Sequence, residues 1–285
     1  MPRKRIEQRA LAEQVRGLDV PRGHLAIWAL GQQGYLLKGG RDVVIIDPYL
    51  SNYVQESTPG KPEALARQVP VVVNPQELGM VTAALSTHHH ADHCDPDTLL
   101  PLLKAAPGAR LLTSHTGRDV LLEHGADPAR VEVPRVETKV ELGHDLSITA
   151  IPSAHYEFEP DAQGNPAYLG FIVEINGVTL YHSGDSIIYE GLVERLKAQP
   201  IDIMCLPING RDWFREQQEL LGNMDYREAA ELASAVGTDV LLPGHNDMFS
   251  GNRINPAYLL DYLSAHHPEQ RAHFLQAGEL YYYVS

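Results

Sequence analysis

The sequence predicts an α/β fold in which two mixed β-sheets are covered by helices on their outer faces. The first observation is a run of short β-rich segments separated by glycine turns, a pattern typical of antiparallel hairpins. The second is the later alternation of strand-like and helix-like segments, as in strand-helix units. The third is the lack of a fixed-period repeat or low-complexity tract in the 285 residues. We therefore expect one domain over residues 1–285, with residues 1–20 as a short N-terminal helical extension.

The N-terminal third of the chain contains a predicted helix, three strands and a loop. Ile6, Leu11 and Val15 lie near one face of a helix over residues 3–17. The next strands are expected over residues 24–30, 34–40 and 41–48. Residues 47–75 are punctuated by Pro, Ser and Gly without a clean period, which predicts a long loop, and such loops in compact domains are usually functional.

The rest of the chain predicts alternating strands and helices. Asp225 and Glu228 form a capping-box pair for one of the helices. In chain order we expect a strand from residue 80 into a His-rich turn, a helix over 96–106, a strand over 109–114, a helix over 117–124, strands over 131–133, 146–155, 167–175 and 176–185, a helix over 187–197, a strand over 201–208, a helix over 226–236, a strand over 239–245, a helix from 256 and a closing strand over 273–284.

The composition is that of a globular protein, with 44% hydrophobic and 21% charged residues. The formal net charge of −14 repels polyanions, so we expect no nucleic acid partner. No segment reaches the about 18 apolar residues of a membrane span, and the first residues lack the apolar core of a secretory signal. Cys94 and Cys205 are too few for a disulfide framework. These features predict a cytoplasmic protein without a membrane partner; a homo-oligomer is left open.

The pattern that carries chemistry is His88, His90, Asp92 and His93, on a turn that leaves a strand. Neutral imidazole and carboxylate are good ligands for zinc, manganese or iron. A His-x-His-x-Asp-His pattern can give one pair of side chains to one ion and the other pair to a second. The alternative is a solvated His-rich loop.

Three further residues of the same chemical types each stand where a predicted strand ends: His155, Asp185 and His245. Each alone is more often a cap or a turn former than a ligand. Their recurrence after the first motif reverses that expectation. The sequence therefore predicts a metal site made of these three residues together with the four of the turn.

The seven residues together resemble the ligand set of the metallo-β-lactamase superfamily. The segments that resemble one branch of it, which contains L-ascorbate-6-phosphate lactonase, a manganese-dependent cytosolic hydrolase, are GHLAIWALGQQGYLLK, IDPYLSN, STHHHADHCD, YHSGDS and PGHNDMFSGN. The resemblance implies an αββα sandwich with two divalent metal ions, manganese or zinc, at the sheet edges. It implies that one ion is held by His88, His90 and His155, the other by Asp92, His93 and His245, and that Asp185 bridges the two.

Such a site predicts a metal-dependent hydrolase that uses an activated water on a small anionic substrate, a lactone or an ester. Asp92 is the expected catalytic residue, because a ligand carboxylate with one free oxygen can orient the water or accept its proton. Asn209, Arg211 and Asp212 follow a predicted strand and are expected to contact the substrate. An amide and a guanidinium offer planar recognition of phosphate or carboxylate. The alternative is a solvent-facing loop.

Three other functions use the same residues. A phosphodiesterase or nuclease would attack phosphorus at the same metal site, although the net charge of −14 argues against the nuclease. An iron-based redox protein would need a flavin partner or an electron-transfer domain. A non-catalytic metal-binding module is the third alternative, and the complete set of seven ligands argues against it.

Overall fold

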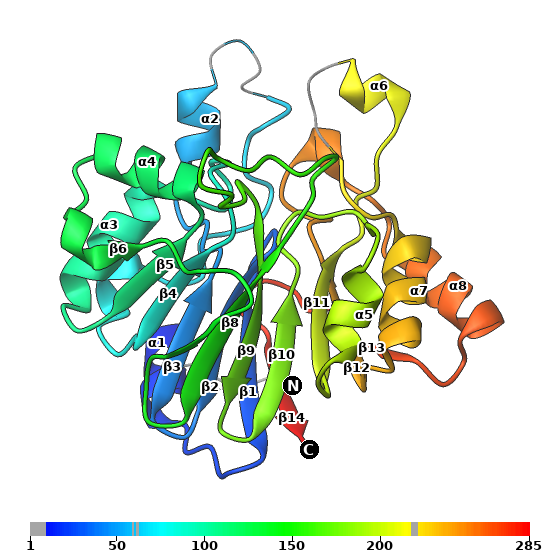
Figure 1. Cartoon of the computed structure of the whole chain (residues 1–285), viewed down its shortest axis with the longest axis horizontal. Helices are drawn as coiled ribbons and strands as arrows, with labels where there is room; N and C mark the ends of the chain where they lie inside the picture. The colour runs from blue at the N-terminus through cyan, green and yellow to red at the C-terminus, as the bar shows by residue number, and fades with distance from the viewer. Residues whose placement is uncertain (1–9, 59, 61–62, 218–221) are drawn as a thin grey trace, which may run out of the picture.

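The computed structural model describes residues 10–58, 60, 63–217 and 222–285. Its strands form two sheets packed face to face, and helices cover the outer face of each sheet (Figure 1). This arrangement confirms the predicted fold class, an αββα sandwich. Within the described residues the first sheet has the strand order β14-β1-β2-β3-β4-β5-β6 and the second has the order β13-β12-β11-β10-β9-β8-β7.

The strands of the first sheet are β1 (His24–Gly31), β2 (Gly34–Gly39), β3 (Asp42–Ile46), β4 (Ala83–Ser86), β5 (Arg110–Thr113), β6 (Val131–Glu132) and β14 (Leu280–Val284). Those of the second sheet are β7 (Lys139–Glu141), β8 (Leu146–Pro152), β9 (Leu169–Ile175), β10 (Val178–His182), β11 (Ile203–Pro207), β12 (Val240–Gly244) and β13 (Arg271–Ala272).

The α-helices of the described chain are α1 (Leu11–Gly17), α2 (Tyr53–Ser57), α3 (Pro96–Ala105), α4 (His115–Glu123), α5 (Leu192–Lys197), α6 (Trp213–Glu216), α7 (Tyr226–Val236) and α8 (Ala257–His266). Short 3-10 helices cover Pro75–Glu77, Pro128–Arg130 and Ser250–Asn252. None of the helices in this part of the chain has both the length and the apolar character needed to cross a bilayer.

Both sheets are mixed in the same way. In the first, β14, β1, β2 and β3 pair antiparallel and β3 to β6 pair parallel. In the second, β7 to β10 pair antiparallel and β10 to β13 pair parallel. Hairpins thus come first in each half and strand-helix units follow, as the sequence predicts.

Strand β1 shows why both faces of the first sheet are apolar. Because successive side chains on a strand point to opposite faces, Leu25 and Ile27 pack between the two sheets. Ala26 and Trp28 pack on the outer face, in the core that includes residues of α1, α3 and α4. The outer face of the second sheet is covered in the same way by residues of α5, α7 and α8. Burial on both faces accounts for the nearly continuous apolar runs of these strands.

The pairing directions bring several strand ends to one edge. In the second sheet β8, β10 and β12 run in the same direction, so their C-terminal ends lie together. In the first sheet the same holds for β1, β3 and β4. Helices α2 and α6 lie at this end of the sandwich, at the top of Figure 1. Residues that directly follow these strands are therefore neighbours in space.

Some helix limits differ from the expected ones. The expected loop over residues 47–75 contains the short helix α2. Helix α5 begins at Leu192 rather than at residue 187, because Gly191 has a φ of 86°, which is incompatible with an α-helix. Helix α6 was not expected; its start is capped by the Asp212 side chain, which accepts from the amides of Phe214 and Arg215. The expected helix over residues 3–17 lies partly outside the described residues.

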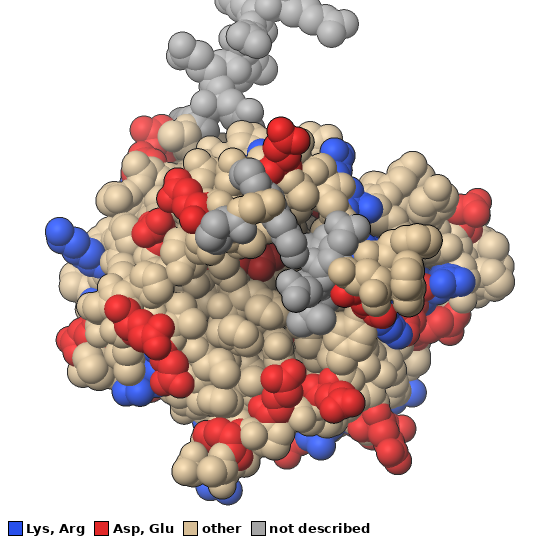
Figure 2. Space-filling view, turned by 90° about the horizontal axis from the view of Figure 1, so that it is seen from above, with Lys and Arg blue, Asp and Glu red and all other residues tan. Residues whose placement is uncertain are grey.

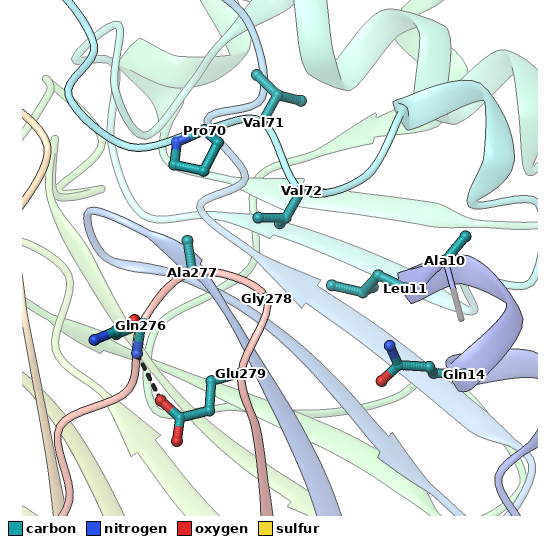
Figure 3. A pocket seen from close by; sticks show the side chains of 10 residues that line it. All are labelled: Ala10, Leu11, Gln14, Pro70, Val71, Val72, Gln276, Ala277, Gly278 and Glu279. Atoms are coloured by element: carbon teal, nitrogen blue, oxygen red, sulfur yellow. Dashed lines mark hydrogen bonds between the residues drawn. The ribbon is translucent and has the colours of Figure 1, made fainter. Parts of the chain in front are cut away.

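A cavity of about 700 Å³ lies between α1, the segment 70–72 and the turn before β14 (Figure 3). In that turn the amide of Gln276 donates to Glu279 Oε2 at 3.0 Å. Leu11 and Gln14 of α1 form the opposite wall. None of the seven expected metal ligands lines this cavity, so it is separate from the His-rich edge of the sandwich.

Candidate metal centre

The seven expected metal ligands converge at the edge where the strand ends meet. His88, His90, Asp92 and His93 lie on the turn between β4 and α3, and the other three follow β8, β10 and β12. Among the described residues three groups could each hold an ion, with ligand atoms within 4.8 Å of one another. These groups are Asp92, His93 and His245; His90, His155 and Asp185; and His88, His93 and Asp185.

Asp185 lies at the centre of this arrangement, within 3.5 Å of three histidines. One carboxylate oxygen lies 3.2 Å from His93 Nε2. The other lies 3.2 Å from His245 Nε2 and 3.5 Å from His155 Nε2. Gly184, just before it, has a φ of 59°, and a Cβ there would lie 2.7 Å from Cβ of Thr87. A glycine is therefore required for Asp185 to lie this close to the His-rich turn.

The spacing of the donor atoms fits a bound cation. With metal–nitrogen distances of about 2.1 Å, tetrahedral ligands lie about 3.4 Å apart. Asp92 Oδ2 lies 3.5 Å from both His93 Nε2 and His245 Nε2. Nε2 of His93 and Oδ1 of Asp185 are buried and have no hydrogen-bond partner among the described residues. Buried polar atoms without partners are costly, and a cation between them would remove that cost.

Asp47, directly after β3, fixes the orientation of two histidines, His93 directly and His88 through Thr87. Its fully buried carboxylate accepts from Nδ1 of His93 and from the hydroxyl of Thr87, each at 2.7 Å, and from the amide of Thr87. Nδ1 of His88 in turn donates to the Thr87 hydroxyl at 2.9 Å. Hydrogen bonds at Nδ1 leave Nε2 of both rings available to a metal ion.

His90, His155 and Tyr168 form the other side of the centre. His90 Nδ1 lies 2.9 Å from His88 Nε2. The Tyr168 ring lies with its centroid 5.1 to 5.8 Å from the centroids of His88, His90 and His155. His89 also contacts Tyr168 but belongs to none of the three ligand groups. Tyr168 thus covers the histidine side of the centre.

Burial and charge divide the histidines into two sets. Burial lowers the pKa of His88 well below its ordinary value and lowers that of His90 to about 3. Burial also opposes the charged forms of His93 and His245, but the nearby carboxylates, Asp185 and Asp92 foremost, together outweigh it. The pKa of His93 is therefore raised well above its ordinary value, and that of His245 to about 9. Nearby His93 and His245 hold the pKa of Asp185 well below its ordinary value despite its burial.

These shifts predict proton release when a metal ion binds. From these shifts we expect His93 and His245 to be protonated at pH 7 in the metal-free protein, and His88 and His90 to be neutral. Because a metal ion binds only the neutral imidazole, binding should release about two protons per chain at pH 7 and fewer above pH 9. Calorimetric titration in two buffers of different ionisation enthalpy measures this number. Metal binding without proton release at pH 7 would contradict the assignment of His93 and His245 as ligands.

The expected substrate residues lie on the segment between β11 and α6. Asn209 is buried and bonds to the side chains of Asn223 and Asn252. Arg211 forms a two-pronged ion pair with Glu228 on α7, at 2.8 and 2.6 Å. Asp212 caps α6. The structure thus gives all three a partner within the protein, and their contact with a substrate stays a prediction.

Sequence reasoning missed Asp47, Gln32 and Tyr168 at this site. Asp47 ends a strand just as Asp185 and His245 do, so the same signal was available in the segment IDPYLSN. Gln32 lies in the turn between β1 and β2, and its Nε2 donates to Asp92 Oδ2 at 2.6 Å. Tyr168 precedes β9 and carries no pattern that would single it out. The last two depend on pairing between distant segments.

A domain model described as "Beta-lactamase superfamily domain" matches residues 43–246, a range that includes all seven expected ligands. A UPF0173 metal-dependent hydrolase of Pyrococcus horikoshii is 26% identical over 220 residues, covering 76% of this chain and 82% of that protein. A probable L-ascorbate-6-phosphate lactonase of Escherichia fergusonii is 24% identical over 276 residues, covering 86% of this chain and 76% of that protein. An isothiocyanate hydrolase from Delia radicum gut bacteria has a similar fold, with a TM-score of 0.71 and 18% identity over 91% of this chain and 100% of its own.

Proposed function

The chain belongs to the beta-lactamase superfamily of metal-dependent hydrolases, and on that premise we propose that it hydrolyses a small anionic lactone or ester with two divalent ions, manganese or zinc. The observation that carries the proposal is the position of Asp185 between His93, His155 and His245, with buried donor atoms that lack protein partners. The lactone is the finer part of the proposal, and the 24% identical lactonase supports it.

When bound, divalent ions at this centre supply Lewis acidity that lowers the pKa of a water and polarises the substrate oxygen. The protein supplies the positioning. Asp92 is ionised, because His93 and His245 hold its pKa well below the ordinary value even though burial opposes this. Its carboxylate can therefore orient an attacking water and accept a proton from it. Asp47 and Thr87 fix the imidazoles of His88 and His93, so that the ligand geometry is in place before substrate binds.

Asn209, Arg211 and Asp212 are the proposed substrate contacts. The support is that the helix that follows these residues, α6, is hydrogen-bonded to Tyr156, the residue next to the expected ligand His155. The Tyr156 ring stacks on His155, and the Tyr156 hydroxyl donates to Glu216 of α6 at 3.0 Å. Arg211 is held by Glu228 in one orientation, which would let its guanidinium meet an anionic group without a further loss of side-chain freedom.

The acidic character of the protein supports a small substrate over a nucleic acid. The net charge is −14, and Asp and Glu side chains are more widespread than Lys and Arg on the face seen in Figure 2. That view looks onto the end of the sandwich and shows a hollow near its centre. A polyanion would be repelled from such a face. Cys94 and Cys205 are buried and unpaired, which supports the proposed cytoplasmic location.

A substrate panel tests this function. Lactones, esters and phosphodiesters, each as an anionic and an uncharged analogue, are assayed with manganese or zinc restored. We expect hydrolysis of anionic lactones or esters. Arg211→Gln should raise KM for the anionic analogue about tenfold or more, the loss of one hydrogen bond to a charged group, and leave the uncharged one unchanged. Arg227→Gln, which removes a surface ion pair to Asp225, is the matched control.

Three outcomes would overturn parts of this proposal. Turnover of phosphodiesters alone would show that the centre attacks phosphorus and that the lactone assignment is wrong. Equal KM values for Arg211→Gln and the control variant would remove Arg211 from the substrate contacts. A metal-loaded protein that hydrolyses none of the panel would point to a non-catalytic binding module.

A further inference from the structure

We propose that Gln32 is a positioning residue of the metal centre: its side chain holds Asp92 and its main chain holds His245, two of the ligands of one of the two ions. This inference rests on the proposed function, because it takes Asp92, His93 and His245 as the ligands of that ion. Three independent features of Gln32 support it.

The first feature is the side-chain amide. Gln32 Nε2 lies 2.6 Å from Asp92 Oδ2 and 3.0 Å from His245 Nε2. These are the same two atoms that lie 3.5 Å apart and face the candidate ion position. The amide donates to Asp92 Oδ2, an oxygen that can accept this bond and still bind an ion, so the carboxylate is fixed before an ion arrives and binding requires less reorganisation.

The second feature is the main chain of the turn. The amide of His245 donates to the carbonyl oxygen of Gln32 at 2.6 Å, and the amide of Gln32 donates to Asp247 Oδ1 at 2.9 Å. Gly244 lies against the same turn, and a Cβ there would come within 2.4 Å of the Gln33 side chain. The β1–β2 turn is thus bonded to both sides of His245, on the segment that leaves β12.

The third feature is backbone strain. Five non-glycine residues in the described part of the chain have positive φ: Gln32, Asp47, Glu137, Asn176 and His245. Asn176 precedes Gly177 in the turn that joins β9 and β10, where such angles are common. Gln32, Asp47 and His245 all border the metal centre, with φ values of 56°, 44° and 57°. A positive φ strains a non-glycine backbone, and residues of this kind cluster at functional sites.

The strain makes a decisive variant available. Glycine adopts a φ of 56° without strain, so Gln32→Gly relieves the backbone while it removes the whole side chain, including the amide that bonds to Asp92. A residue with a purely structural role would tolerate this change. A positioning residue would not, because Asp92 would lose its hydrogen-bond donor. Gln32→Leu is the second variant, since it keeps the bulk and removes the donor.

The test is a titration of metal-free wild-type and variant proteins with Co²⁺, followed by calorimetry and by visible absorption. For the wild type we expect two equivalents. In Gln32→Gly and Gln32→Leu we expect one equivalent to bind about 10–100-fold more weakly, the usual effect of removing an outer hydrogen-bonding partner of a ligand. The other equivalent should be unchanged, and circular dichroism should show that both metal-free variants keep the fold of the wild type.

Gln33→Leu is the matched control. Gln33 lies in the same turn, is fully buried, and its side-chain amide has no hydrogen-bond partner among the described residues. Its Co²⁺ affinities should equal those of the wild type. If both Gln32 variants bind two equivalents as tightly as the wild type, Gln32 is only a turn residue, and the proposed function stands. If the wild type itself binds no Co²⁺, the proposed function and this inference both fail.

Discussion

Asp185→Asn should abolish hydrolysis while leaving the fold intact. The substitution keeps the shape of the side chain but removes the negative charge that lies 3.2 to 3.5 Å from His93, His155 and His245. Removing an outer hydrogen-bonding partner of a metal ligand lowers metal affinity or activity about 10–100-fold. We therefore expect the loss of a shared ligand itself to lower kcat/KM by more than about 100-fold. Steady-state kinetics on the metal-restored protein, with circular dichroism as the folding check, measure it.

Asp119→Asn is the matched control, because Asp119 is an exposed carboxylate on α4 and should leave kcat/KM unchanged. Metal content is measured for both variants. If Asp185→Asn kept full activity at the metal content of the wild type, Asp185 would not bridge two ions and the ligand assignment would be wrong.

Asp47→Ala should have the largest effect on stability. Its carboxylate is fully buried and accepts hydrogen bonds from Thr87 and His93. Removing the acceptor leaves those donors buried and unpaired, and alanine tolerates the φ of 44° less well than aspartate. The free energy of unfolding of the metal-free protein should fall by about 2–4 kcal/mol. Denaturant unfolding measures it, and metal affinity should fall about 10–100-fold.

Asp47→Asn separates the two effects. The amide oxygen still accepts from the backbone of Thr87, and asparagine tolerates positive φ, so part of the stability should return. The amide nitrogen that replaces Oδ2 can accept from neither the Thr87 hydroxyl nor His93, so metal affinity should stay low. An Asp47→Ala protein within about 0.5 kcal/mol of the wild type, the range of neutral surface substitutions, would show that this hydrogen-bond network does not support the fold.

Much of the metal centre follows from one rule that a sequence can supply. His155, Asp185 and His245 each come within three residues after the end of a strand, and strands that run in the same direction end at the same edge. The ligand positions were therefore predictable from strand limits, without knowledge of the sheet order. The apolar runs of β8, β10 and β12 set those limits, because each ends at, or just before, a Gly, Ser or Pro.

The parts that were not predictable depend on contacts between distant segments. Gln32 lies more than 200 residues from His245, and only the packing of the two sheets brings its turn against β12. The sequence shows no partner for the Arg211 guanidinium, but in the structure the first turn of α7 places Glu228 2.6 Å from it. Side-chain partners of this kind follow from tertiary structure, which local patterns do not encode.

We expect the seven residues to form a metal centre with catalytic activity. The most direct measurement is the metal content per chain of protein purified without chelator, by elemental analysis, with hydrolysis of the lactone and ester panel assayed on the same sample. We predict about two equivalents of manganese or zinc, together with turnover that chelation abolishes and the metal restores. A chain that binds no divalent ion, and gains no activity when manganese or zinc is added, would contradict the claim.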